Sequence, residues 1–450
     1  MDNLYDSYRF GMYQQRGDAS MMKKMIRKNI LLFICAFTLW ILGFSGCSNE
    51  RELVKNEVEQ EIISVPVVFR FDPATNISEN EQFIRDYNAA FKNQYQMEVE
   101  WLSTDAAGYR NKLKQWNVLD EMPVLIADAG FDNDFYRVLV KDKRLVDLRP
   151  YMEKSDFWMD VMRKDILAQC VEEDGSIYLS PLSASIDTYA GIIYNEELLA
   201  LAGYESFPDT WSGFFECLEK LNQMDITPLA LHGSGSYWVP MLMATAYLSK
   251  TEEGLAFLNE EYPSSYQNEE MKEMFLMMKE LYGYTFEDAL DLDYDQTAQR
   301  FLKGEAAIIA NGQWMISAMD DNEKEIFRYA PFPAKVMMNS PRMGAWAVTA
   351  GHSEEVTQAA VDALEFRIQC ERKSIEKYSD IDNLSPVARS YYEIISEIDT
   401  IMPNYQMQWE QEIQNDFFTE NLPDFLSGKI DVETFLKMMD IRVDIIQGRK

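Results

Sequence analysis

Histidine and cysteine, which often serve as catalytic bases, nucleophiles and metal ligands, are scarce in this sequence. The only histidines are His232 and His352, and neither has a recognisable nucleophile beside it. The five cysteines lie at scattered spacings that match neither a disulfide framework nor a zinc-ligand pattern. The sequence therefore predicts no cofactor, no structural metal and no enzymatic activity, and the cysteines of the folded part are expected to pack in its interior.

Carboxylates are abundant, with 75 Asp and Glu against 42 Lys and Arg and a formal net charge of -33. This charge repels phosphate backbones and anionic headgroups, which excludes nucleic acid as a partner and favours a neutral or cationic one. Two carboxylates could hydrolyse a glycosidic bond, but with so many acidic residues their spacing has no discriminating power. A surface-anchored glycosidase therefore stays open as an alternative.

The amino-terminal region predicts export and lipid attachment. A basic stretch at 22–28 precedes an uncharged apolar run at 30–42, the order found in signal peptides. Small residues then lead into Cys47, which resembles the lipobox of bacterial lipoproteins, although Phe44 replaces the usual aliphatic residue. We expect residues 1–46 to be leader and signal peptide, Cys47 to carry a lipid, and 47–61 to be a polar tether. An uncleaved membrane anchor is the alternative.

The remainder of the chain alternates between strand and helix patterns. Residues 62–71 and 97–102 are predicted strands on either side of a helix over 79–94, and a buried strand is expected over 123–129. Another strand begins near residue 190, and Asp209 or Thr210 is expected to cap a helix that extends through Leu221. This alternation predicts mostly parallel sheets flanked by helices.

Several short motifs, in order along the chain, resemble the family 1 extracellular solute-binding proteins, whose best-known member is the maltose-binding protein. Each motif is weak alone, but together they extend over most of the exported part. They lie at 193–198, 208–214, 301–314, 331–333, 344–348, 401–409 and 426–433.

This resemblance implies a two-lobed periplasmic-binding-protein-like fold of type II, with crossing segments between two α/β lobes. The expected division puts 62–187 plus 345–395 in lobe 1, and 188–344 plus 396–450 in lobe 2. The ligand would be held in a cleft between the lobes. The fold accepts many solutes, so the ligand must be argued from the site itself.

A neutral sugar offers flat C–H faces and a rim of hydroxyls, which suit aromatic platforms and carboxylate acceptors. The resemblance places Trp314, Trp409 and the pair Tyr237 and Trp238 at aromatic positions of the cleft. Strand ends and crossings add Asp72, Asp187 and Trp346 as candidates.

We therefore expect an extracytoplasmic lipoprotein, attached to the bacterial cell membrane through Cys47. It would bind a carbohydrate, most simply an oligosaccharide, by closure of the two lobes and deliver it to the permease subunits of an ABC importer. We expect the protein to be a monomer. A cationic or peptidic solute in the same fold is the main alternative to a sugar.

Overall fold

The computed structural model describes most of the exported part of the chain. The predicted leader and tether, residues 1–61, lie outside the described residues. So do three of the candidate residues, Cys47, Asp72 and Asp187. The described residues are 62–71, 78–104, 106–127, 131, 133–181, 189–234, 237–260, 263–342, 344–377, 383–398, 400–410 and 412–448.

A first, four-stranded sheet has the order β2-β1-β3-β8. Strand β1 pairs in parallel with both β2 and β3, as the sequence predicted, and β8 runs antiparallel to β3. The strands are β1 (Ile63–Phe71), β2 (Tyr95–Ser103), β3 (Leu125–Ile126) and β8 (Ala347–Val348).

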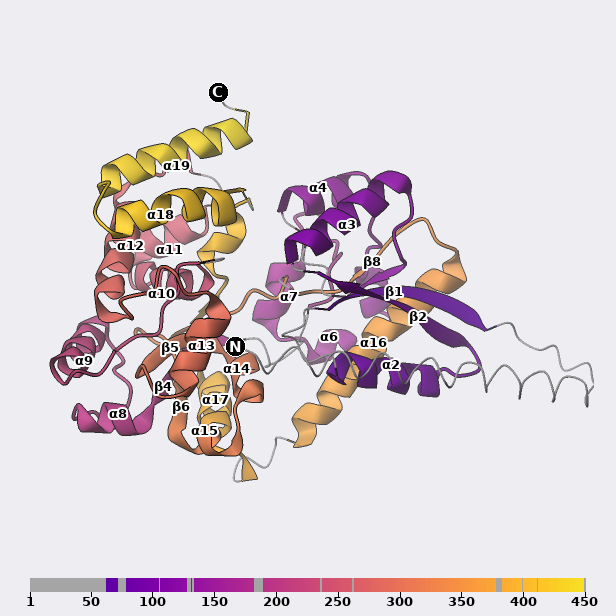
Figure 1. Cartoon of the computed structure of the whole chain (residues 1–450). Coiled ribbons are helices and arrows are strands. Elements are labelled where there is room, and N and C mark those ends of the chain that lie inside the picture. The colour runs from indigo at the N-terminus through magenta and orange to yellow at the C-terminus, as the bar shows by residue number, and fades with distance from the viewer. Residues whose placement is uncertain are drawn as a thin grey trace, which may run out of the picture. The chain divides into compact units, whose positions relative to one another are not determined.

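Both faces of this sheet are buried. Side chains along β1 point alternately to the two faces, and each face packs in an apolar cluster of its own. Val67 and Phe69 belong to one apolar cluster, and Val68 between them belongs to another. Helices α2 and α16 cover the first face, and α3 and α4 cover the second (Figure 1). The helices of this part are α2 (Ser78–Ala90), α3 (Ala106–Leu119), α4 (Asn133–Lys141), α5 (Arg149–Met152), α6 (Trp158–Val161), α7 (Lys164–Cys170) and α16 (Glu354–Lys377). We call the two clusters together the first core.

A second sheet has the order β5-β4-β7-β9, with β6 also paired to β4. The expectation of mostly parallel strands is wrong for this sheet, since β5, β6 and β7 all run antiparallel to β4 and only β7 and β9 are parallel. The long helical excursion after β4 brings the chain back at the end of the sheet where β4 stops, since Ile308 at the start of β5 pairs with Tyr194, and a return at the same end makes the two strands antiparallel. The strands are β4 (Ala190–Asn195), β5 (Ile308–Gly312), β6 (Phe327–Ala330), β7 (Val336–Met338) and β9 (Thr400–Met402).

Helices around the second sheet form one large apolar cluster, which we call the second core. Thr210 caps α9 as predicted, accepting a hydrogen bond from the Gly213 amide at 3.2 Å. The helices are α8 (Glu196–Leu201), α9 (Trp211–Gln223), α10 (Trp238–Leu248), α11 (Glu252–Leu258), α12 (Glu269–Leu281), η1 (Tyr282–Tyr284), α13 (Tyr294–Leu302), α14 (Gln313–Ala318), α15 (Asp321–Ile326), α17 (Pro386–Glu397), η3 (Tyr405–Gln408), η4 (Glu412–Phe417), α18 (Phe418–Leu426) and α19 (Val432–Ile446).

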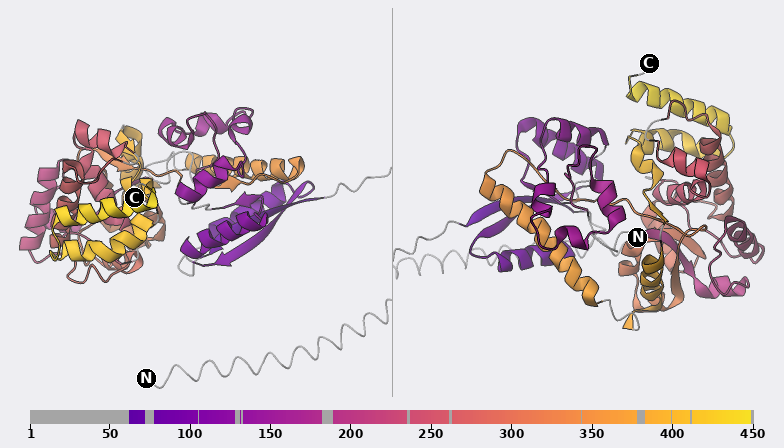
Figure 2. Two further views of the ribbon diagram at one scale, coloured as in Figure 1. Left: turned by 90° about the horizontal axis from the view of Figure 1, so that it is seen from above. Right: turned by 180° about the vertical axis from the view of Figure 1, so that it is seen from behind.

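Helix α17 packs in the second core, although the sequence-based division had placed residues 345–395 with lobe 1. Val387, Tyr391 and Ile395 recur every four residues, so they form one apolar stripe, and all three belong to the second core. The hydroxyl of Ser390 accepts a hydrogen bond from the Tyr329 amide of β6 at 2.8 Å. Figures 1 and 2 show α17 among the strands of the second sheet.

Candidate functional site

The carboxyl end of β5 presents an aromatic side chain to solvent. Trp314 follows this strand in the first turn of α14 and is 36% exposed, which is unusual for an indole in this fold. A Cβ on Gly312 would lie only 2.1 Å from Cζ3 of Trp314, so the ring occupies the space that any larger residue would fill. Gly312 has φ -115° and ψ 179°, which any residue adopts, so the ring contact alone requires glycine here.

Tyr294, the first residue of α13, fixes the polar edge of that indole. Its hydroxyl accepts a hydrogen bond from Trp314 Nε1 at 3.3 Å and from Asn311 Nδ2 at 3.0 Å. The ring of His232 meets Tyr294 edge-on with 5.9 Å between centroids. Burial raises the pKa of Tyr294, so the phenol stays neutral at physiological pH. The result is an exposed indole whose polar edge is held by the Tyr294 hydroxyl, which the buried Asn311 side chain supports from behind.

Trp238 is the second predicted aromatic residue that is not fully enclosed. It opens α10 and is half-buried. The carbonyl oxygen of Trp238 accepts a hydrogen bond from the side-chain Nδ2 of Asn404 at 3.4 Å. The backbone N–H of Asn404 donates to Ser340 Oγ at 3.2 Å. The start of α10 is thus tied to the segments that follow β7 and β9.

Three other predicted aromatic residues are buried instead of being presented to a ligand. Trp409 is 1% exposed, because Tyr405, Phe418 and Tyr266 surround it with ring centroids at 5.0, 5.2 and 6.3 Å. Tyr237 packs against the same Phe418, and burial raises the pKa of its phenol to about 12.

Trp346 is likewise enclosed, within the first core. Phe69 and Phe83 both meet it edge-on at 5.3 Å, and the Arg367 guanidinium lies 4.8 Å from the ring centroid. In this conformation Tyr237, Trp346 and Trp409 stabilise the cores and offer no free ring face.

Sequence reasoning overlooked Tyr294 and the side-chain role of Asn311. Asn311 lies in the 301–314 motif that had been singled out, but its side chain was not considered as a support for Trp314. Tyr294 has no such signal, because its link to Trp314 depends on how α13 packs beside β5.

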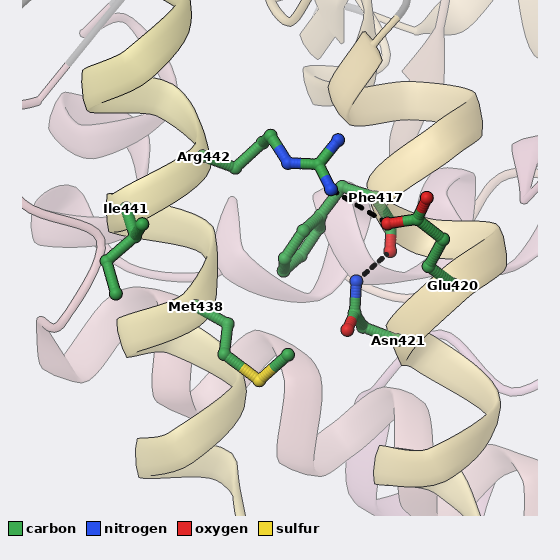
Figure 3. A pocket seen from close by; sticks show the side chains of 6 residues that line it. All are labelled: Phe417, Glu420, Asn421, Met438, Ile441 and Arg442. Atoms are coloured by element: carbon green, nitrogen blue, oxygen red, sulfur yellow. Dashed lines mark hydrogen bonds and ion pairs between the residues drawn. The ribbon is translucent and has the colours of Figure 1, made fainter.

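A separate recess lies between α18 and α19, with a volume of about 350 Å³ (Figure 3). Its polar groups already bind each other, since Arg442 pairs with Glu420 at 2.8 Å and Asn421 Nδ2 donates to the Phe417 carbonyl oxygen at 2.8 Å. It therefore offers few free hydrogen-bonding groups to a polar solute. Within the described ranges, no three His, Cys, Asp or Glu side chains gather as metal ligands, and no helix is long and apolar enough to cross a bilayer.

Comparison with known proteins identifies the class to which this fold and site belong. A family model described as bacterial extracellular solute-binding protein matches residues 84–410. Since this is well over half of the chain, the chain belongs to that family, and the resemblance seen in its motifs is confirmed.

Among curated proteins, the multiple sugar-binding protein of Streptococcus mutans serotype c (strain ATCC 700610 / UA159) is 26% identical over 224 residues. The match covers 47% of this chain and 51% of that protein, so the chain spans about half the length of this relative.

Two solved structures confirm the predicted two-lobed α/β fold. A chitin oligosaccharide binding protein has a TM-score of 0.67 at 19% identity, covering 85% of this chain and 98% of its own. A Streptococcus pneumoniae solute-binding protein in complex with the blood group A-trisaccharide also has a TM-score of 0.67, at 16% identity, covering 85% and 99%.

Proposed function

We propose that this protein binds a carbohydrate on the extracytoplasmic side of the membrane and delivers it to an ABC importer. The observation that carries the proposal is the exposed indole of Trp314, held by Gly312 and Tyr294 beside the amide of Asn311. A flat, exposed apolar face held in a fixed orientation suits the C–H face of a sugar ring.

The names of the relatives support a sugar over other solutes. The curated relative is a multiple sugar-binding protein, and the two structural neighbours are described with a chitin oligosaccharide and with a trisaccharide. A cationic or peptidic solute is the second candidate, favoured by the strongly acidic composition. It ranks lower because the side chains of Tyr294 and Asn311, which hold the edge of Trp314, are neutral.

In the proposed site, Trp314 is the main stacking platform and Trp238 a second aromatic contact. Asp72 and Asp187 supply carboxylates that accept hydrogen bonds from sugar hydroxyls, as proposed from their places in the sequence. Tyr237, Trp346 and Trp409 support the site through packing and are not assigned a direct contact. Ligand that touches both lobes would favour a closed conformation, which the permease subunits then recognise.

Attachment through a lipid on Cys47 would keep this monomeric binding protein near its importer. Replacement Cys47→Ser should abolish incorporation of an alkyne-tagged fatty acid in cells and release the protein from the membrane fraction. A protein that stays membrane-bound and unlabelled after this replacement would instead favour an uncleaved apolar anchor.

The family binds solutes, and we propose that this member also leaves its solute unchanged. Incubation with oligosaccharides followed by product analysis separates binding from hydrolysis. Recovery of intact sugar supports a carrier, whereas shortened products would make the protein a glycosidase.

A thermal-shift screen across oligosaccharides, peptides and polyamines tests the solute class, because a ligand that binds only the folded state raises Tm. We expect trisaccharides or chitin oligosaccharides to raise it and the other classes to leave it unchanged. Trp314→Ala should reduce the shift, because weaker binding stabilises the folded state less. Leu201→Ala, which truncates an apolar side chain that is 64% exposed on α8, is the matched control and should retain it.

A further inference from the structure

Tyr189 directly precedes β4 and is held rigidly in the second core. Its side chain is fully buried. Its amide donates to the Tyr391 hydroxyl at 3.4 Å, and its carbonyl oxygen accepts from the Tyr329 hydroxyl at 3.0 Å. Both partners belong to the second core, so the main chain of Tyr189 moves with that core.

The hydroxyl of Tyr189, in contrast, binds a helix of the first core. It donates to Asp165 Oδ2 at 2.8 Å, and Asp165 lies in α7, which Ile166 and Cys170 anchor in the first core. A hydroxyl that donates to a carboxylate makes a charge-assisted hydrogen bond, which is stronger than one between neutral groups.

Arg163 completes this connection from the first core. Its guanidinium lies 5.3 Å from the centroid of the Tyr189 ring, and its Nε pairs with Asp165 Oδ1 at 3.1 Å. It also donates to the carbonyl oxygen of Ile395 in α17 at 3.4 Å. A planar guanidinium can stack on a ring and bind a carboxylate at the same time, which a lysine cannot reproduce.

These contacts lie where the chain passes from one core to the other. Leu179 belongs to the first core and Tyr189 to the second, and the return passage runs from Met338 to Ala345. Burial raises the pKa of the Tyr189 phenol, and Asn339, at the start of that return, lies close enough to lower it in part. One phenol thus connects both passages to α7.

We propose that Arg163, Asp165 and Tyr189 form a pivot that holds the rotation axis between the two lobes. They act as positioning residues and do not touch the solute. The inference rests on the lobe closure of the proposed function. Contacts beside a hinge axis are displaced least when domains rotate, so this pivot can persist in both conformations and restrict the motion to one direction. Without it, the lobes would sample a wider range of orientations.

Spin labels on the unliganded full-length protein test the pivot directly. Labels attached through a keto amino acid at Val138 of α4 and Leu276 of α12, which are 45% and 44% exposed, avoid the native cysteines. Pulsed dipolar spectroscopy then gives the distribution of distances between the two cores. We expect Tyr189→Phe and Asp165→Asn to make this distribution at least about twice as wide as in the parent protein.

Tyr87→Phe is the matched control, because its hydroxyl donates to the Ala359 carbonyl oxygen at 2.9 Å entirely within the first core. This variant also loses a buried hydrogen bond but should keep the narrow distribution. An unchanged width in Tyr189→Phe, or equal broadening in Tyr87→Phe, would overturn the proposal. Because no ligand is present, this result is independent of whether a sugar binds in the thermal-shift screen.

Discussion

Replacing Gly312 with alanine should weaken sugar binding without touching the sugar. The new Cβ would fall 2.1 Å from Cζ3 and 2.3 Å from Cη2 of Trp314, well inside van der Waals contact. The backbone at Gly312 accepts alanine, so the strain must be relieved by displacing the indole. That displacement also breaks the hydrogen bond that Trp314 Nε1 donates to the Tyr294 hydroxyl.

The size of the effect follows from the exposed part of the ring. An indole buries about 150–250 Å² when fully covered, and 36% of Trp314 is available to a ligand. Covering roughly 55–90 Å² at about 25 cal/mol per Å² is worth about 1.4–2.3 kcal/mol. Losing this contact corresponds to an increase in Kd of about 10–50-fold.

Isothermal titration calorimetry with the sugar that gives the largest thermal shift measures this change. Trp314→Ala should raise Kd by the same factor. The double variant Gly312→Ala, Trp314→Ala should have the same Kd as Trp314→Ala alone, because both substitutions remove the same stacking contact. Gly283→Ala is the control glycine, because a Cβ there meets no atom within 4 Å. An unchanged Kd in both Gly312→Ala and Trp314→Ala would refute the reasoning.

Three further changes test other parts of the account. Tyr294→Phe frees the Trp314 indole and should raise Kd about 3–10-fold in calorimetry with little change in Tm, as expected for a lost hydrogen bond of about 1 kcal/mol. Burial raises the pKa of the Cys170 thiol from 9.0 to about 12, so its contribution to stability is present below pH 9 and is lost as pH rises toward 12. Between pH 8 and pH 10, the free energy of urea unfolding should therefore fall by about 1.4 kcal/mol more in the parent protein than in Cys170→Ala. Asp440→Ala should lower the free energy of unfolding by about 2 kcal/mol, because Asp440 binds Ser265, Tyr266 and Gln267, and an unchanged urea midpoint would contradict this.

Elements with a strong local pattern were predictable from the sequence. The apolar run of β1, the strand β4 and the Thr210 cap all depend on neighbouring residues, and the structure has them where the sequence placed them. The 301–314 motif correctly indicated a strand that leads to Trp314, and Asn311 and Gly312 are the last residues of that strand, in extended backbone.

Features that depend on contacts distant in sequence could not be predicted. The residues next to Trp409 in the sequence do not indicate whether its ring is exposed or buried. Phe418 of α18 and Tyr266 of the loop before α12 cover the ring, and this burial depends on how those two elements pack. The antiparallel strands beside β4 and the place of α17 were missed for the same reason. The bond between Tyr189 and Asp165 joins residues of two different cores, and no local pattern indicates it.

A crystal structure of the protein with a bound oligosaccharide tests the central claim most directly. We expect a sugar ring stacked on Trp314, with carbon atoms about 3.5–4.5 Å from the indole plane. A sugar bound elsewhere, with the Trp314 ring still open to solvent, would contradict the account.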